Sequence, residues 1–267
     1  MITMNRAFSL VELAIVLVIL GLITGGILSG KALIRGASLK SIPQSLANYE
    51  KAVGLYRDTY KALPGDHARA TQIWGRVGGG SGQCATPATD IGTSTETCNG
   101  NGDGVIGPAA ERYELHRFWQ HLSNAGMIEG RYTGVQGGGG LFNVVPGTNG
   151  PMTSLSRDSG YSFMNAGVIT NPAMVGMFLG DYSRMFEVGM KTTALRTMGS
   201  LFRPKEVWSI DVKIDDGVPG YGKIRQYKSN YATYGVNCTT SADPDTAKYQ
   251  ITADAIGCSL IYLPTTF

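Results

Sequence analysis

An apolar run that contains one acid restricts the fold of this chain more than any other feature. The run extends from Phe8 to Leu28, and its only charged side chain is Glu12. At about 1.5 Å per residue, a helix of this length spans ~31 Å, which is enough to cross the hydrocarbon of a bilayer. A carboxylate costs about 2.5–3.5 kcal/mol at the centre of such a segment and less near its edge. We therefore expect a membrane-spanning helix in which Glu12 needs a partner.

The segment before this run differs from an ordinary secretory signal. Residues 1–7 form a short leader, with the basic Arg6 and the small Ala7 directly before Phe8. A secretory signal places its apolar stretch before a small-residue cleavage site, whereas here the small residue comes first. Cleavage between Ala7 and Phe8 would therefore leave the apolar helix on the mature chain.

The sequence from Arg6 to Glu12 resembles the processing site of type IV prepilins and of type II secretion pseudopilins. The resemblance covers residues 4–35, and Ala7 stands where the family usually has glycine. It implies that a prepilin peptidase cuts between Ala7 and Phe8 and methylates the new amino group of Phe8. It also implies that Glu12 pairs with that amino group on a neighbouring subunit. A plain signal anchor with an incidental glutamate is the alternative interpretation.

Beyond Lys31 the apolar pattern changes to alternating steps of three and four, which predicts an amphipathic helix. The stripe consists of Leu39, Ile42, Leu46, Tyr49, Val53, Tyr56 and Tyr60. We expect one helix from Phe8 to Lys61, kinked at Pro43 and ended by the sequence around Pro64. The stripe can pack on the chain's own globular domain, on neighbouring helices, or on both.

The chain divides into four segments. They are the prepilin-type leader (1–7), a hydrophobic transmembrane and assembly helix (8–30), its amphipathic continuation (31–62) and a globular extracytoplasmic head domain with long loops (63–267). In the head, apolar periodicity predicts helices over Glu111–Ile128 and Met185–Gly199, and strands over Tyr161–Met164, Val175–Leu179, Val207–Ile214 and Gly222–Tyr227. A long first helix followed by loops and a mostly antiparallel sheet predicts an α+β fold, in which the helix packs against the C-terminal globular domain. The resemblance to pilins implies the same fold.

The cysteines indicate the compartment of the head domain. Four cysteines allow three pairings, and the simplest is the local one, Cys84–Cys98 and Cys238–Cys258. A zinc site is the competing interpretation, but no Cys-x-x-Cys motif supports it. Disulfides place the domain outside the cytosol.

The charges around the apolar run favour the opposite orientation. Arg6 alone precedes the run, whereas Lys31, Arg35 and Lys40 follow it, and basic residues usually stay on the cytoplasmic side. We give more weight to the cysteines and the leader. We expect a single-pass protein of the inner membrane that later enters an extracellular or periplasmic filament.

One loop carries a partial calcium-binding pattern. Asn99, Asn101 and Asp103 occupy positions one, three and five of an EF-hand loop, with glycine at position six. Position twelve is Ala110, and Glu111 comes one residue late, so the bidentate ligand is out of register. Calcium is therefore a possible ligand here, and a glycine-rich turn is the alternative. A second acidic group, Asp211, Asp215 and Asp216, is expected to form a tight hairpin turn.

Composition argues against several function classes. The net charge is +3 and charged residues make up 16% of the chain, and no basic block indicates a nucleic-acid site. The three histidines, His67, His116 and His121, belong to no catalytic motif, so we do not expect an enzyme, and no cofactor is required.

These features predict a structural subunit, a major or minor pilin, of a type IV pilus or related filament. The expected partners are identical or related subunits, the prepilin peptidase, an inner-membrane assembly platform and membrane lipid. A type II secretion pseudopilin and a signal-anchored, calcium-dependent surface binding protein are the alternatives.

Overall fold

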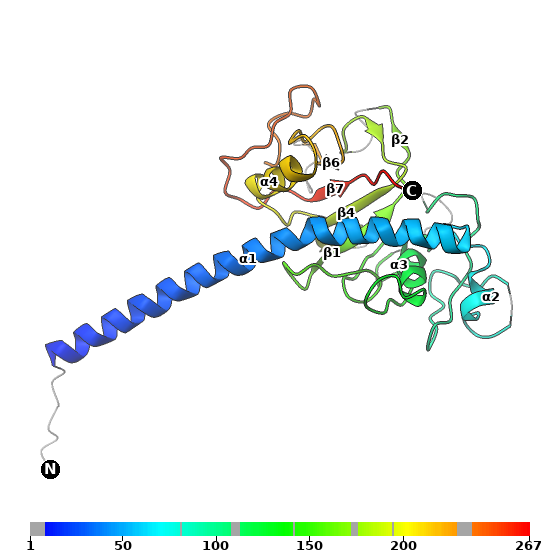
Figure 1. The fold of residues 1–267 in the computed structure, drawn as a ribbon, viewed down its shortest axis with the longest axis horizontal. Helices are drawn as coiled ribbons and strands as arrows, with labels where there is room; N and C mark the ends of the chain where they lie inside the picture. Colours follow the sequence, from blue (N-terminus) through cyan, green and yellow to red (C-terminus); the bar gives the residue numbers. More distant parts are fainter. Residues whose placement is uncertain are drawn as a thin grey trace, which may run out of the picture.

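The computed structural model describes residues 9–80, 82–107, 113–140, 142–171, 176–193, 195–228 and 237–267. It consists of a 51-residue first helix and a C-terminal domain built around an antiparallel sheet (Figure 1). The α+β class expected from the sequence is therefore confirmed. Ala7 and Phe8, the expected cleavage site, lie outside the described residues.

The first helix, α1, spans Leu10–Tyr60 without interruption. Pro43 lies inside it and does not end it. The helix ends at Lys61, whose φ of 55° is left-handed and whose N–H donates to the carbonyl of Arg57 at 2.9 Å. Figure 1 shows that its N-terminal half projects away from the domain and its C-terminal half lies along the domain.

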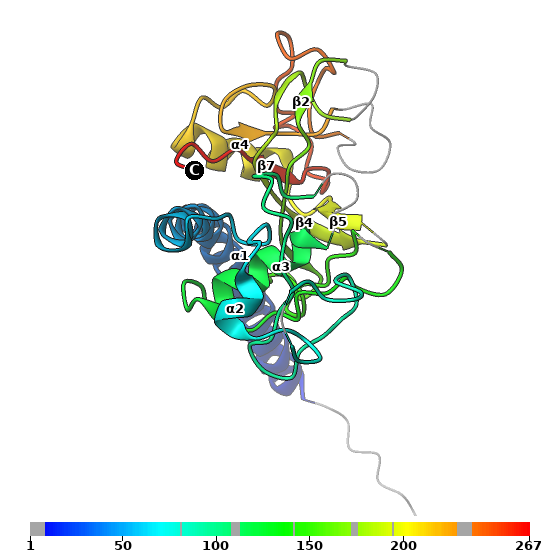
Figure 2. The ribbon, with the colours of Figure 1, turned by 90° about the vertical axis from the view of Figure 1, so that its right-hand side faces the viewer.

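The C-terminal half of α1 belongs to the core of the head. Ile42, Leu46, Val53 and Tyr56 are fully buried, so the amphipathic stripe packs on the chain's own domain. Each buried side chain of this size stabilises the fold by about 1.5–3 kcal/mol relative to exposure. Viewed nearly end-on, the helix lies between α4 on one side and α3 on the other (Figure 2).

An ion pair marks the point where α1 leaves the head. Arg35 Nε lies 2.5 Å from Glu206 Oε1, and its Nη2 lies 2.7 Å from Oε2. Glu206 also accepts the Arg203 amide at 2.8 Å, which caps the start of α4 (Pro204–Ile214). The head is thus anchored to α1 from Arg35 onward.

The main sheet is antiparallel throughout. Its strands follow the order β1 (Ser159–Met164), β4 (Met185–Thr192), β7 (Leu260–Tyr262) and β6 (Ile224–Arg225), and β5 (Leu195–Gly199) pairs with the end of β4. A second, two-stranded sheet contains β2 (Val168–Ile169) and β3 (Gly180–Asp181). The expected strand Tyr161–Met164 is confirmed within β1.

The predicted helix over Met185–Gly199 is wrong, because this segment forms the hairpin of β4 and β5. Its Met, Glu, Lys and Arg residues favour helix in isolation. In the sheet, Phe186 and Val188 face the core, while Glu187 pairs with Arg196 across the hairpin at 2.6 Å. Tertiary pairing therefore overrides local propensity.

The predicted strand Val207–Ile214 is also wrong, because these residues lie in α4. Val207, Ile210 and Asp211 are buried, at helical spacing, after a proline at the first turn. The expected strand Gly222–Tyr227 shortens to β6, with Tyr227 in a single bridge to Met177. Of the expected strand Val175–Leu179, Val175 lies outside the described residues, and the remainder contributes only this bridge.

The predicted helix over Glu111–Ile128 is confirmed as the shorter α3 (Glu114–Asn124), with Glu111 outside the described residues. A short helix, α2 (Ala70–Trp74), precedes the long loop and was not expected. The apolar side chains of α3 join the core; they are Leu115, Phe118, Trp119 and Leu122.

Candidate functional site

The N-terminal half of α1 is an exposed apolar surface. Its most apolar 18-residue window has no buried residue, and α1 is the one helix among the described residues that is long and apolar enough to cross a membrane. The large exposed side chains are Leu10, Val11, Leu13, Ile15, Val16, Leu17, Val18, Ile19, Leu20, Leu22, Ile23, Ile27, Leu28, Leu33 and Ile34. A continuous apolar surface of this size requires lipid or other protein to cover it.

Glu12 lies at the start of this surface and caps its own helix. Its Oε2 accepts the Ser9 amide at 2.9 Å, and Ser9 Oγ accepts the Val11 amide at 3.3 Å. A carboxylate in the first turn also interacts favourably with the helix dipole. The acid therefore points toward the N-terminal end of α1, beside Ser9.

Small residues interrupt the apolar surface at a regular spacing. Gly21 and Gly25 form one pair four residues apart, and Gly26 and Gly30 form another. Apart from the adjacent residues and the nearby backbone of α1 itself, no atom lies within 4 Å of where their side chains would begin. The two pairs lie on different faces of α1, and each can therefore admit another helix at close range.

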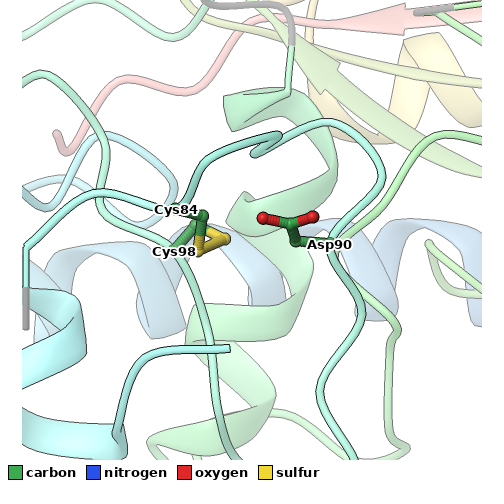
Figure 3. A group of neighbouring side chains, drawn as sticks. All are labelled: Cys84, Asp90 and Cys98. Atoms are coloured by element: carbon green, nitrogen blue, oxygen red, sulfur yellow. A yellow bond between two sulfur atoms is a disulfide. The ribbon is translucent and has the colours of Figure 1, made fainter. Parts of the chain in front are cut away.

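The two expected disulfides are present, between Cys84 and Cys98 and between Cys238 and Cys258. Beside the first of them lies the carboxylate of Asp90 (Figure 3). Asp90 accepts the Thr86 amide at 3.0 Å, and both nearby cysteines are oxidised. A metal thiolate site is therefore not available at this cluster.

The polar side chains of α3 hold the loop closed by the first disulfide. Arg117 Nη2 donates to the carbonyls of Pro87 at 2.9 Å and Asp90 at 2.6 Å, and contacts Cys98 Sγ at 3.0 Å. Burial lowers the pKa of Arg117 to about 10, so it stays charged at neutral pH. The loop is thus fixed on the helix.

Buried hydrogen bonds engage His67 and His121. The Gly65 amide donates to His121 Nδ1 at 2.9 Å, so Nε2 carries the proton toward Thr97 Oγ1 at 3.0 Å. Burial, Arg117 and His67 hold the pKa of His121 well below its usual value. His67 Nδ1 lies 2.8 Å from the Tyr56 hydroxyl, and His116 is buried.

The expected calcium loop has a different arrangement from an EF-hand. Asn99 Oδ1 accepts the Thr71 amide at 2.9 Å, so this side chain holds α2 instead of facing the loop. Asn101 and Asp103 remain together, with Asn101 Nδ2 2.8 Å from Asp103 Oδ2. The expected twelfth position, Ala110, lies outside the described residues.

Two acids that the sequence did not single out contact this loop. Asp66 accepts amides from Gly102, Asp103 and Gly104, and Glu114 Oε1 accepts the Asn101 amide at 3.0 Å. Burial, with Asp66 and Asp103 nearby, raises the pKa of Glu114 to about 8 despite this hydrogen bond. Burial also raises the pKa of Asp66. No spacing in the sequence links them, since Asp66 follows α1 and Glu114 begins α3.

The second acidic group lies at the end of α4 and not in a strand hairpin. Asp211 accepts the Tyr249 hydroxyl at 2.7 Å and the Gly217 amide at 3.2 Å, and Asp216 accepts the Val218 amide at 2.7 Å. These donors, together with the Asp215 bond to the Lys223 amide, shape the turn after the helix. The group therefore has a structural explanation.

Comparison of the chain with protein-family models, with curated proteins and with solved structures found no match.

Proposed function

We propose that this chain is a major or minor pilin, a structural subunit of a type IV pilus or a related filament. Its first helix holds it in the inner membrane, with the head outside the cytoplasm, until a prepilin peptidase and an assembly platform convert it into a filament subunit. The continuous helix α1 is the observation that supports this most, because one half is wholly exposed and apolar while the other half forms the head's core. Identical or related subunits would cover the exposed half.

The proposed role of Glu12 is to pair subunits. One of its oxygens accepts the Ser9 amide, and a carboxylate offers about four acceptor positions, so it can also accept bonds from an ammonium group. That ammonium would be the amino terminus of Phe8 on the adjacent subunit. In the low dielectric between apolar helices the attraction is strong, and it offsets part of the cost of burying both charges.

Processing is tested by co-expressing the full chain with a prepilin peptidase and measuring its intact mass. We expect the loss of Met1–Ala7 together with the gain of one methyl group. A chain that keeps its leader would contradict the proposal and favour the signal-anchored binding protein.

Assembly is tested with Glu12→Val and with Ser9→Ala as its matched control. Both variants disrupt the cap at the start of α1, but only the first removes the charge. We expect Glu12→Val to abolish filaments in surface-sheared fractions and Ser9→Ala to retain them. Normal filaments from Glu12→Val, or loss in both variants, would show that the acid does not act by charge pairing.

A type II secretion pseudopilin would undergo the same processing. Deleting the gene separates the two functions, since a pseudopilin is required for protein secretion and a pilin for surface filaments. We expect loss of filaments with secretion intact.

A further inference from the structure

Three segments that are distant in the sequence meet near the C-terminal end of α1. They are Gly65–Asp66, the loop 99–104 and Glu114 at the start of α3. A side chain on Gly100 would begin 2.4 Å from Asp66 Cα, and one on Gly65 would begin 2.5 Å from the Glu114 carbonyl oxygen. Glycine is thus required at both positions for the segments to approach this closely.

The acids at this junction accept fewer hydrogen bonds than they can. Asp66 Oδ1 accepts two amides, at 2.6 and 3.1 Å, but its Oδ2 accepts one, at 2.8 Å. Glu114 is fully buried, and the backbone of Asn101 and of Gly107 contacts its carboxyl group. Its Oε2 has no hydrogen-bond partner of normal geometry among the described residues. Its other oxygen contacts the Asn101 amide, so the unpartnered oxygen belongs to a carboxylate that touches the loop. A buried oxygen without a partner costs about 1–3 kcal/mol, and more when charged.

No cation from the described part of the chain compensates these acids. None of the ion pairs found there includes Asp66, Asp103 or Glu114. Four basic residues line the recess beside Asp66, and none of them forms an ion pair with it; they are Arg57, Lys61, Arg69 and Arg184. Burying carboxylates without a countercharge is unfavourable, and a bound metal ion is one way to supply it.

We propose that Asp66, Asp103 and Glu114 bind a calcium ion, with Asn101 as a further oxygen ligand. All four side chains offer oxygen atoms, which Ca²⁺ prefers, and Ca²⁺ tolerates the irregular geometry that Mg²⁺ does not. This ligand set differs from the EF-hand pattern, because Asp66 and Glu114 come from outside the loop and Asn99 is engaged elsewhere.

Binding requires a small rearrangement. The three carboxylates do not all lie within 4.8 Å of one another. Asp103 is exposed, so its side chain can turn toward the two buried acids from the solvent side. The ion would tie the end of α1, the loop and α3 together.

The proposal is tested by titrating the purified full chain in detergent with CaCl₂ after chelator treatment, using calorimetry and thermal melts. We expect binding at millimolar calcium or below, the range of extracellular calcium modules, and a rise in melting temperature that chelator reverses. The isosteric Glu114→Gln should weaken binding at least ten-fold. Without calcium it should melt close to wild type, because glutamine has nearly the same size and keeps the oxygen that accepts the Asn101 amide.

Two controls distinguish this site from other acidic groups. Glu129→Gln removes an exposed charge beyond α3, and Asp215→Asn alters the cluster after α4; both should bind calcium as wild type does. The proposal is overturned if wild type shows no calcium response, if Glu114→Gln binds normally, or if Asp215→Asn alone abolishes binding. An equal response to MgCl₂ would overturn the assignment to calcium. None of these outcomes depends on processing or filament assembly.

Discussion

Replacing Arg196 with methionine should destabilise the head domain more than any change to a surface charge. Arg196 Nε lies 2.6 Å from Glu187 Oε2 and its Nη2 3.1 Å from Oε1; the side chains are 11% and 0% exposed. Removing one member of a buried ion pair costs about 3–5 kcal/mol, because the other charge stays buried without compensation. Ser162 Oγ, at 3.1 Å, and the Tyr227 hydroxyl still donate to Glu187, so we expect a value near the lower limit, about 3 kcal/mol.

For a domain of this size, that loss should lower the melting temperature by roughly 6–12 °C. Urea unfolding of the full chain in detergent, monitored by fluorescence and far-UV circular dichroism, measures the loss in the free energy of unfolding. The comparison holds if the dependence of that free energy on urea concentration is the same in both proteins. The matched control is Arg203→Met. Arg203 is 40% exposed and pairs with the exposed Asp254, and its other partner, Glu206 at 3.6 Å, keeps its ion pair with Arg35; the loss of Arg203 should therefore cost at most about 1 kcal/mol.

The double variant Glu187→Gln with Arg196→Met tests the reasoning further. It removes the uncompensated charge, so it should be more stable than Arg196→Met alone. If Arg196→Met is as mild as Arg203→Met, or if the double variant is less stable than the single one, the buried-charge explanation is wrong.

Two further predictions concern the attachment of α1 and the first disulfide. Burial raises the pKa of Glu50, but bonds from Tyr262, Thr265 and Thr266 outweigh it and hold the pKa below its usual value. Glu50 therefore stabilises the fold above pH about 4.5 and loses this effect as acid protonates it; Glu50→Gln should remove that part of the acid sensitivity in unfolding measured from pH 7 to 3. Replacing both Cys84 and Cys98 with serine should lower the free energy of unfolding by about 3 kcal/mol, because the disulfide closes a loop over a separation of 14 residues. Urea unfolding measures this loss, and a loss below about 1 kcal/mol would contradict the prediction.

The sequence predicts the parts of the fold that local pattern determines. The apolar residues from Leu39 to Tyr60 repeat at helical spacing throughout, and the sequence after Tyr60 ends the helix clearly. Both the helix and its buried face can therefore be predicted from this segment. The local cysteine pairing is the one found. These features depend on residues that are neighbours in the chain.

The sequence fails where partners are distant. In β4 and β5, residues that favour helix form strands because Glu187 and Arg196 form an ion pair across the hairpin. In α4, the residues from Val207 to Ile214 also fit an alternating pattern. The proline in the first turn favours a helix, and the contact of Glu206 with the Arg203 amide and its ion pair with Arg35 stabilise that helix. Both cases depend on tertiary contacts.

The candidate sites follow the same division. Glu12 can be singled out from the sequence because the residues that suggest its role, the apolar run and the segment before it, adjoin it in the chain. Asp66 and Glu114 are not, because folding alone brings the end of α1 and the start of α3 to one loop.

The position of α1 inside the head has a mechanical consequence. A pull on the projecting end acts along the helix axis, parallel to the surface over which residues from Arg35 to Tyr56 contact the domain. Force in this direction shears the contacts all at once, whereas a perpendicular force would peel them apart one after another. In the proposed filament, tension would therefore meet the head as a unit, with the Arg35–Glu206 pair the first contact to receive the strain.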